Sequence, residues 1–273
     1  MSTPSRAPSR HPRHVLAVFA HPDDEILCGA GTLALCAARG AHVTLVCATR
    51  GELGPIASPE LATHQTLPQV RERELRASCK HLGIEDVRFL GLPDAGVSWA
   101  AEEAGTVSNL VMLIRELKPR VILTFGSDGL YGHFDHEAIG ELTTKARSVA
   151  ADPHAIPDAG QGFASARLFY PVITSTMIAE LLAGAKQAGI PDSLWKLKPA
   201  AFTGEASSIT TQVDVSSVLP RKLAALACHR TQLEADNVLK HLTPGLAKQF
   251  FGTEYFRCVD GGQQSPLEVL GAA

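Results

Sequence analysis

Two short segments of this chain combine imidazoles and carboxylates at spacings that suit a metal ion. The first is His21-Pro22-Asp23-Asp24-Glu25, and the second is His133-Phe134-Asp135-His136. Two imidazoles and one carboxylate form a common ligand set for catalytic zinc, and they leave one coordination position for water. Zinc lowers the pKa of that water to about 7, so hydroxide becomes available at neutral pH. The pattern therefore predicts metal-assisted hydrolysis.

The residue types alone allow more than one division of roles within the two segments. His21 can share a metal ion with either Asp23 or Asp24, because a sharp turn brings their side chains to the same side. His136 can complete the set from the second segment. The carboxylate that the metal does not use can accept the proton of the attacking water. Acids in a first helical turn are also ordinary capping residues, so the role of Glu25 stays open.

The second segment holds two further polar side chains. His133 is available to meet negative charge that develops on a carbonyl oxygen, and Asp135 can orient one of the histidines. Two histidines and one carboxylate also suit non-haem iron in an oxygenase. The additional acid and histidine favour hydrolysis, because hydrolysis needs groups that move protons.

Each of these segments follows a short, uncharged, apolar run, which is typical of a strand buried on both faces. Strands and helices alternate along the chain, which predicts an α/β fold: a Rossmann-like, doubly wound, mostly parallel sheet of order 3-2-1-4-5 with C-terminal α/β additions. In this order the first and fourth strands are neighbours at the switch point, so the two histidine segments meet. Strands are predicted at 15–20, 43–48, 87–90, 121–125, 168–173, 209–215 and 254–259, and helices at 25–39, 67–82, 107–117, 135–150, 177–189, 220–229 and 246–251.

The composition fits one large α/β domain and a small-molecule substrate. The 273 residues are 45% hydrophobic, with a net charge of −3 and scattered positive residues. Such a chain offers no basic surface for nucleic acid or anionic lipid. We expect a single domain over residues 15–273, in which 15–173 form the core sheet with the metal site and 174–273 complete the pocket. A homo-oligomer is left open.

The first 14 residues and the cysteines indicate the compartment. Residues 1–14 are rich in Ser, Pro, Arg and His, and we expect a disordered lead that lacks the apolar region of a signal peptide. No later apolar run is long enough to span a membrane. The six cysteines include no C-x-x-C pair and fall mostly in apolar segments, which favours buried free thiols in a reducing compartment. These features predict a cytoplasmic protein.

The motifs together resemble those of the PIG-L/LmbE-like family of zinc-dependent N-deacetylases, some of which act on N-acetylglucosaminyl-inositol species. The resemblance covers about residues 15–150 and weakens afterwards. It implies a hydrolase that removes the acetyl group of an N-acetylglucosamine-type sugar or conjugate, releasing acetate and a free amine. Besides the two histidine segments it is carried by Gly51-Glu52, Arg71 with Glu74, Leu92-Pro93-Asp94, Lys222, His229-Arg230-Thr231-Gln232 and Glu254-Tyr255-Phe256.

The resemblance also implies roles for individual residues. The metal ligands would be His21, Asp24 and His136, holding Zn²⁺, with Fe²⁺ as the alternative in the cell. Asp23 would be the general base that later returns the proton to the leaving amine. The further catalytic residues would be His133, as an imidazolium paired with Asp135, and Tyr131, which matches a mobile tyrosine over the oxyanion in some members.

Four more positions match residues that bind the substrate in relatives: Glu52, Arg71, Asp94 and His229. Each also has an ordinary structural interpretation. Glu52 fits a solvated loop acid, Arg71 half of a surface helix pair, Asp94 a turn former and His229 a cation at a helix C-terminus. The family's second segment often reads His-Pro-Asp-His, whereas this chain carries phenylalanine in place of the proline.

Two alternative functions remain beside N-deacetylation of a sugar. Some members of the family cleave larger amides, such as mycothiol S-conjugates or acyl groups on antibiotics, and the irregular stretches 55–66 and 152–165 can shape a deeper pocket for them. The other alternative is a sugar-binding or metal-binding module without turnover. The intact set of acids and histidines argues against that module.

Overall fold

The computed structural model describes residues 13–102, 105–191, 194, 197–233 and 237–271. Within them, seven strands form one sheet of order β3-β2-β1-β4-β5-β7-β6. The first five strands pair in parallel, which confirms the predicted order 3-2-1-4-5. Their bounds are β1 (His14–Phe19), β2 (His42–Cys47), β3 (Asp86–Phe89), β4 (Val121–Leu123) and β5 (Arg167–Pro171).

The C-terminal part of the chain widens this sheet with two further strands. β7 (Thr253–Cys258) runs antiparallel to both β5 and the edge strand β6 (Thr211–Asp214). In β6, Thr211 and Val213 are buried whereas Gln212 and Asp214 are exposed. This alternation is expected of a strand that packs on the core through one face only. The predicted C-terminal α/β additions are therefore part of the sheet.

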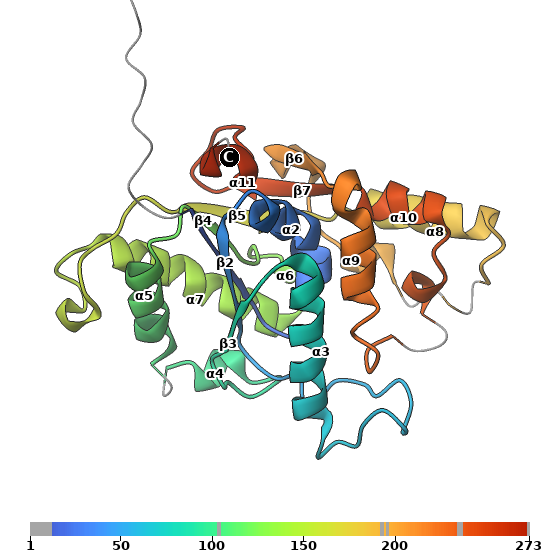
Figure 1. Ribbon diagram of the computed structural model, residues 1–273, viewed down its shortest axis with the longest axis horizontal. Helices are drawn as coiled ribbons and strands as arrows, with labels where there is room; N and C mark the ends of the chain where they lie inside the picture. The colour runs from blue at the N-terminus through green and yellow to red at the C-terminus, as the bar shows by residue number, and fades with distance from the viewer. Residues whose placement is uncertain (1–12, 103–104, 192–193, 195–196, 234–236, 272–273) are drawn as a thin grey trace, which may run out of the picture.

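Helices cover both faces of the sheet (Figure 1). On one face α2 (Ala30–Ala38), α3 (Leu67–Leu82) and α9 (Leu219–Leu226) pack against each other, and on the other α5 (Thr106–Leu117) lies against α7 (Phe134–Ala151). The remaining helices are α1 (Asp24–Cys28), α4 (Val97–Ala100), α6 (Gly129–Gly132), α8 (Ser175–Gln187), α10 (Pro244–Phe251) and α11 (Pro266–Leu270), with 3-10 turns at Pro157–Ala159, Pro199–Ala201, Ala206–Ser208, Ser216–Val218 and Val238–His241.

The prediction of one helix over residues 25–39 is wrong. Gly29 adopts φ 142°, which no α-helix contains, and it separates α1 from α2. A Cβ at this position would lie 3.0 Å from Leu123 Cδ2 in β4, so only glycine allows the chain to pass this close to the sheet. The break leaves α1 as a single turn that carries the acidic residues.

The core lies between the sheet and its helices. The side chains of Leu16 and Phe19 in β1 are buried, and Phe19 packs edge-on against Phe125 with ring centroids 5.5 Å apart. Burial of each such side chain contributes about 1.5–3 kcal/mol, so the strand that carries the first histidine segment is firmly anchored. All six cysteines are free, and all but Cys228 are buried, which confirms the prediction of buried free thiols for five of them.

The first strand begins one residue earlier than predicted. The sequence predicts a disordered lead up to His14, but His14 is the first residue of β1 and pairs with His42 of β2. Its Nε2 lies 3.1 Å from Thr44 Oγ1. Residues 1–12, which the same prediction covers, lie outside the described part of the chain. None of the described helices is both long and apolar enough to cross a membrane.

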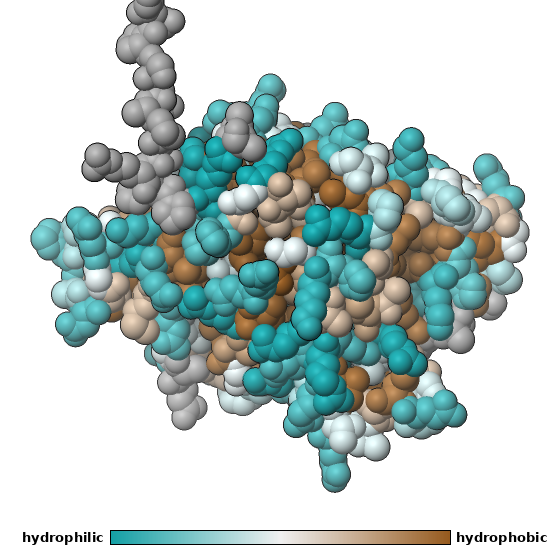
Figure 2. Space-filling model, viewed as in Figure 1, coloured by the Kyte–Doolittle hydropathy of each residue, from teal (hydrophilic) through white to brown (hydrophobic). Residues whose placement is uncertain are grey.

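Polar side chains cover much of the face over α3, whereas apolar side chains reach the surface near α9 and α10 (Figure 2). There Leu223 and Leu226 of α9 line a groove with Leu242. The groove shares no residue with the two histidine segments.

Candidate metal centre and active site

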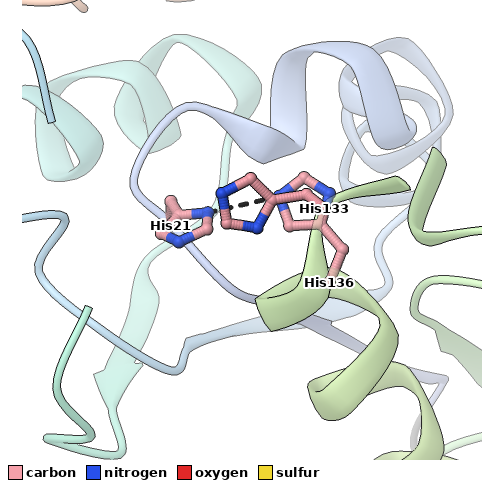
Figure 3. A group of neighbouring side chains, drawn as sticks. All are labelled: His21, His133 and His136. Carbon is pink, nitrogen blue, oxygen red and sulfur yellow. Dashed lines mark hydrogen bonds between the residues drawn. The ribbon is translucent and has the colours of Figure 1, made fainter. Parts of the chain in front are cut away.

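The sheet brings the two histidine segments together, as predicted. β1 and β4 are parallel neighbours with Ala17 opposite Leu123, so both segments leave the same edge of the sheet. His21 lies in the loop that follows β1, and His136 lies in the first turn of α7. The His21 Nδ1 and His136 Nε2 atoms are 3.2 Å apart, and both rings are largely buried (Figure 3).

Asp24 completes a group of three converging donors. Its Oδ1 lies 3.2 Å from His136 Nε2, and its Oδ2 lies 3.6 Å from His21 Nδ1 while accepting a 2.7 Å hydrogen bond from the His21 backbone N–H. Ligand atoms about 2.1 Å from a tetrahedral metal ion lie about 3.4 Å from each other. The 3.2 Å between His21 Nδ1 and His136 Nε2 is close to this value, and the Asp24 carboxylate presents one oxygen to each ring.

The neighbours of the two imidazoles leave the inward nitrogens free for a metal. His136 Nδ1 lies 3.0 Å from the Gly129 carbonyl oxygen and can only donate to it. His21 Nε2 lies 3.2 Å from Asp94 Oδ1 and 3.4 Å from Asp135 Oδ2, so it carries a proton as well. In the neutral rings His21 Nδ1 and His136 Nε2 then present lone pairs to each other. A cation between them is the arrangement that satisfies both.

His21, Asp94 and Asp135 also form a second cluster whose ligand atoms lie within 4.8 Å of one another. Both Asp135 oxygens already accept backbone hydrogen bonds, from Ala95 N at 2.8 Å and Val97 N at 3.0 Å. The His21 ring nitrogen that faces this cluster is the one that carries the proton. We therefore interpret these carboxylates as groups that orient His21 and not as a second set of ligands.

In the metal-free protein, the surroundings of His21 and Asp24 shift the pKa values of both groups. Burial disfavours charge on His21, but the hydrogen bonds to Asp135, Asp24 and Asp94 outweigh it and raise the pKa of His21 to about 12. Burial likewise disfavours charge on Asp24, yet His136 and His21 hold the pKa of this carboxyl well below its usual range. The carboxylates around His21 thus stabilise positive charge at the centre of the site.

These shifts lead to a testable expectation for the metal-free protein. Because the pKa of His21 is raised, its ring is an imidazolium far above pH 6.5, and we expect nitrogen-15 NMR at pH 9 to show both ring nitrogens protonated. Adding zinc at the same pH should convert the ring to its neutral form, because a metal ligand must give up its proton. Asp94→Asn should lower this pKa. A neutral His21 in the metal-free protein at pH 9 would contradict the assignment.

His133 and Asp135 pair differently from the prediction. The backbone N–H of Asp135 donates to His133 Nδ1 at 3.2 Å, whereas the carboxylate faces His21. Burial, followed by the charges of His136 and His21, lowers the pKa of His133. The ring is therefore neutral at pH 7 and carries its proton on Nε2, a hydrogen-bond donor. The imidazolium that the family resemblance implied is disfavoured by this surrounding charge.

Aromatic rings stack through the site from the core to the surface. Phe125 lies against His136 with centroids 4.0 Å apart, His136 against His133 at 4.7 Å, and His133 against Phe134 at 4.9 Å. Phe134, which replaces the family's proline, is 52% exposed and covers the outer face of His133. Tyr131 packs edge-on against His136 at 5.1 Å. Burial raises the pKa of Tyr131, so its hydroxyl stays protonated.

Asp23 differs from Asp24 in both surroundings and backbone. Its side chain is 33% exposed, and its Oδ2 accepts a 3.0 Å hydrogen bond from Arg71. Partial burial raises the pKa of Asp23, while the positive charge of Arg71 opposes the rise. Its φ of 125° is rare for any residue with a side chain, and such strain costs about 1–3 kcal/mol. Arg71 is no surface residue: it is 4% exposed and also donates to the carbonyls of Pro22 and Gly51.

The other predicted substrate contacts divide into two kinds. Glu52 accepts from the Asp94 backbone N–H at 2.9 Å and is only half-buried, so a ligand at the edge of the site can reach it. His229 is 1% exposed, and its Nε2 lies 2.6 Å from Glu25 Oε1. The prediction that His229 contacts the sugar is corrected by this burial, because the ring lies in the protein interior against Glu25. The Gly129 carbonyl, which orients His136, was not predicted, because every residue has such a group.

Comparisons with known proteins point to one family. The family model described as PIG-L, GlcNAc-PI de-N-acetylase, matches residues 16–147. A 1D-myo-inositol 2-acetamido-2-deoxy-alpha-D-glucopyranoside deacetylase from Streptomyces avermitilis is 36% identical over 283 residues, which cover 94% of this chain and 95% of the relative.

Among solved structures, an N,N'-diacetylchitobiose deacetylase from Pyrococcus horikoshii superposes with a TM-score of 0.66 at 19% identity, covering 90% of this chain and 84% of that one. GalB, a 4-carboxy-2-hydroxymuconate hydratase from Pseudomonas putida, superposes with a TM-score of 0.65 at 19% identity, covering 93% and 99%. These two structures share the fold with different named reactions, so the sequence relatives decide the family. The chain belongs to the PIG-L family of GlcNAc-PI de-N-acetylases.

Proposed function

We propose that this protein is a zinc-dependent N-deacetylase that hydrolyses the acetamide of an N-acetylglucosamine-type sugar or conjugate, releasing acetate and a free amine. The observation that carries the proposal is the convergence of His21, Asp24 and His136 beside the partly exposed carboxylate of Asp23. Relatives that the chain matches over most of its length are named as deacetylases of an N-acetylglucosaminyl inositol. We assign His21, Asp24 and His136 as the metal ligands, with Fe²⁺ as the alternative to Zn²⁺.

When bound, the metal ion would polarise the amide carbonyl and make a water molecule more acidic. Asp23 takes the proton of this water as the oxygen–carbon bond forms, and its raised pKa suits that task. The same carboxyl then gives the proton to the amine nitrogen as the carbon–nitrogen bond breaks. The neutral His133 and the hydroxyl of Tyr131 donate hydrogen bonds to the charge that develops on the carbonyl oxygen.

We assign the sugar hydroxyls to the rim formed by Glu52 and Asp94. Asp94 links this rim to the centre, because one oxygen accepts from Leu53 N at 2.9 Å and the other lies 3.2 Å from His21 Nε2. A hydroxyl bound there would be held at a fixed distance from the metal ligands. We propose that Arg71 holds Asp23 and does not bind the sugar, because its guanidinium already donates to Asp23 and to two backbone carbonyls.

The remaining features complete the proposal. We propose one domain over residues 15–273, in which residues 174–273 close the pocket, a cytoplasmic location and no nucleic-acid partner. The contact of Tyr131 with Phe202, at 5.7 Å between ring centroids, supports the role of the C-terminal part. A homo-oligomer is compatible with this arrangement, since the site is assembled within one chain.

Acetate release distinguishes the candidate substrates. We expect the zinc-loaded protein to hydrolyse an N-acetylglucosaminyl inositol faster than free N-acetylglucosamine, because contacts to the second ring contribute binding energy to the reaction. The assay should include a mycothiol-type S-conjugate with a larger amide. Faster cleavage of that conjugate would favour the amidase alternative. No release of acetate from any of these compounds in the presence of zinc would favour the non-catalytic module and overturn the proposal.

A further inference from the structure

A buried hydrogen-bonded network lies directly behind Asp23. Glu25 is 1% exposed, and its Oε1 lies 2.6 Å from His229 Nε2 and accepts a 2.5 Å hydrogen bond from Ser78 Oγ. Its other oxygen, Oε2, accepts a 3.1 Å hydrogen bond from the backbone N–H of Asp23. The Glu25 carboxylate thus joins the strained residue to two side chains of the core. Ser78 and His229 are themselves fully buried.

The contact to the Asp23 backbone has a specific consequence. Asp23 adopts φ 125°, a conformation that persists only where the surroundings impose it. Two groups hold this peptide: Arg71 donates to the Pro22 carbonyl at 2.6 Å, and Glu25 accepts from the Asp23 N–H. Both contacts therefore hold the same peptide unit, the one that precedes Asp23, one through its carbonyl and the other through its N–H. The direction of the Asp23 side chain follows from this backbone, and with it the difference between Asp23 and Asp24.

His229 brings the C-terminal part of the chain into this network. It follows α9, and its own N–H donates to the Leu226 carbonyl at 3.1 Å. Two residues later, Thr231 is bound to Glu74 of α3 through its N–H at 2.9 Å and its hydroxyl at 2.5 Å. The turn that carries the imidazole is thus held by Glu74, a residue outside the Glu25 network. Its Nδ1 is buried without a hydrogen-bond partner among the described residues, so its Nε2 contact with Glu25 is its one polar anchor there.

We propose that Glu25 and His229 are positioning residues that hold the strained backbone of Asp23, so that its carboxylate faces the reacting water while Asp24 faces the histidines. Neither side chain contacts the substrate. The inference rests on the proposed role of Asp23 as general base, and it explains why two buried residues far apart in the sequence match the family pattern.

The test compares Glu25→Ala with Glu254→Ala, a matched removal of a buried carboxylate whose hydrogen bonds go to Gly31, Thr32 and Lys222 and not to Asp23 or His229. We expect both variants to lower Tm, and only Glu25→Ala to lower kcat, by about 10- to 100-fold with KM within about twofold and zinc retained. Glu25→Gln should restore most of the lost kcat, because its amide oxygen can accept the same N–H. His229→Ala should show a smaller decrease of kcat, and it provides the test if Glu25→Ala does not fold.

A structural readout separates this proposal from the proposed function. In the crystal structure of Glu25→Ala, or of His229→Ala, we expect Asp23 to relax from φ 125° toward negative φ. If φ stays near its original value, the positioning role is overturned, whatever the activity. If φ relaxes but the wild-type protein releases no acetate, the positioning role stands and the proposed function fails. An equal fall of kcat in Glu254→Ala would also overturn the proposal, because loss of fold rigidity would then explain it.

Discussion

Replacing Asp23 with Asn is expected to lower kcat by about 10²- to 10⁴-fold while the metal content stays that of the wild-type protein. Asn keeps the size of the side chain and can still accept from Arg71, which lies 3.0 Å from Asp23 Oδ2. It cannot take a proton from water. Because the carboxylate of Asp24 and not that of Asp23 lies against His21 and His136, the metal site itself should be unaffected.

The measurements for Asp23→Asn are acetate release, zinc per chain by atomic absorption, and Tm. A matched control is Asp128→Asn, which changes a carboxylate that caps the turn of α6 through Leu130 N and contacts neither histidine ligand. We expect this control to keep kcat within about threefold, since the Asn oxygen can accept the same capping hydrogen bond. Turnover of Asp23→Asn at the wild-type rate would show that another group accepts the proton.

Replacing His136 with Ala is expected to abolish metal binding and, with it, activity. Removal of a group that merely orients a ligand costs about 10- to 100-fold in metal affinity, so the loss of a ligand should exceed about 100-fold. The ring is fully buried between Phe125 and His133, so the variant also loses packing and should show a lower Tm. Metal titration of the chelator-treated protein gives the affinity directly.

His133→Ala is the informative companion to His136→Ala. His133 forms a cluster with His21 and His136 whose ring nitrogens lie within 4.8 Å of one another, so geometry alone also allows a set of three histidines. If His133 donates to the carbonyl oxygen, as proposed, His133→Ala should keep its metal and lose turnover. If it loses the metal as His136→Ala does, while Asp24→Ala retains it, the ligand set is the three histidines and the assignment of Asp24 is wrong.

The location and chemistry of the site could be predicted from the sequence because both are local properties. A buried apolar strand followed by His21 and three acids places a charged loop at a strand end, and the same holds for the segment that contains His136. The alternation of strands and helices predicts the order of the first five strands, and with it the neighbourhood of β1 and β4. The two segments therefore had to meet at one edge of the sheet.

The division of labour inside the site was decided by tertiary structure. By residue type Asp23 and Asp24 are equivalent as ligands, and only the family resemblance favours Asp24. In the structure the backbone of Asp23, with its φ of 125°, turns the two carboxylates apart. The motif could not show this, because the groups that hold the strained backbone, Arg71 and Glu25 with His229, reach Asp23 through contacts between distant parts of the chain.

Burial changed three further interpretations for the same reason. Arg71 has the spacing of a surface helix residue, and His229 has that of a pocket residue, yet each is at most 4% exposed once α3 and α9 pack together. Asp135 stands beside His133 in the sequence but directs its carboxylate to His21, 3.4 Å away. Motifs specify which functional groups a chain possesses. Packing decides which of them face the ligand and which hold the others in place.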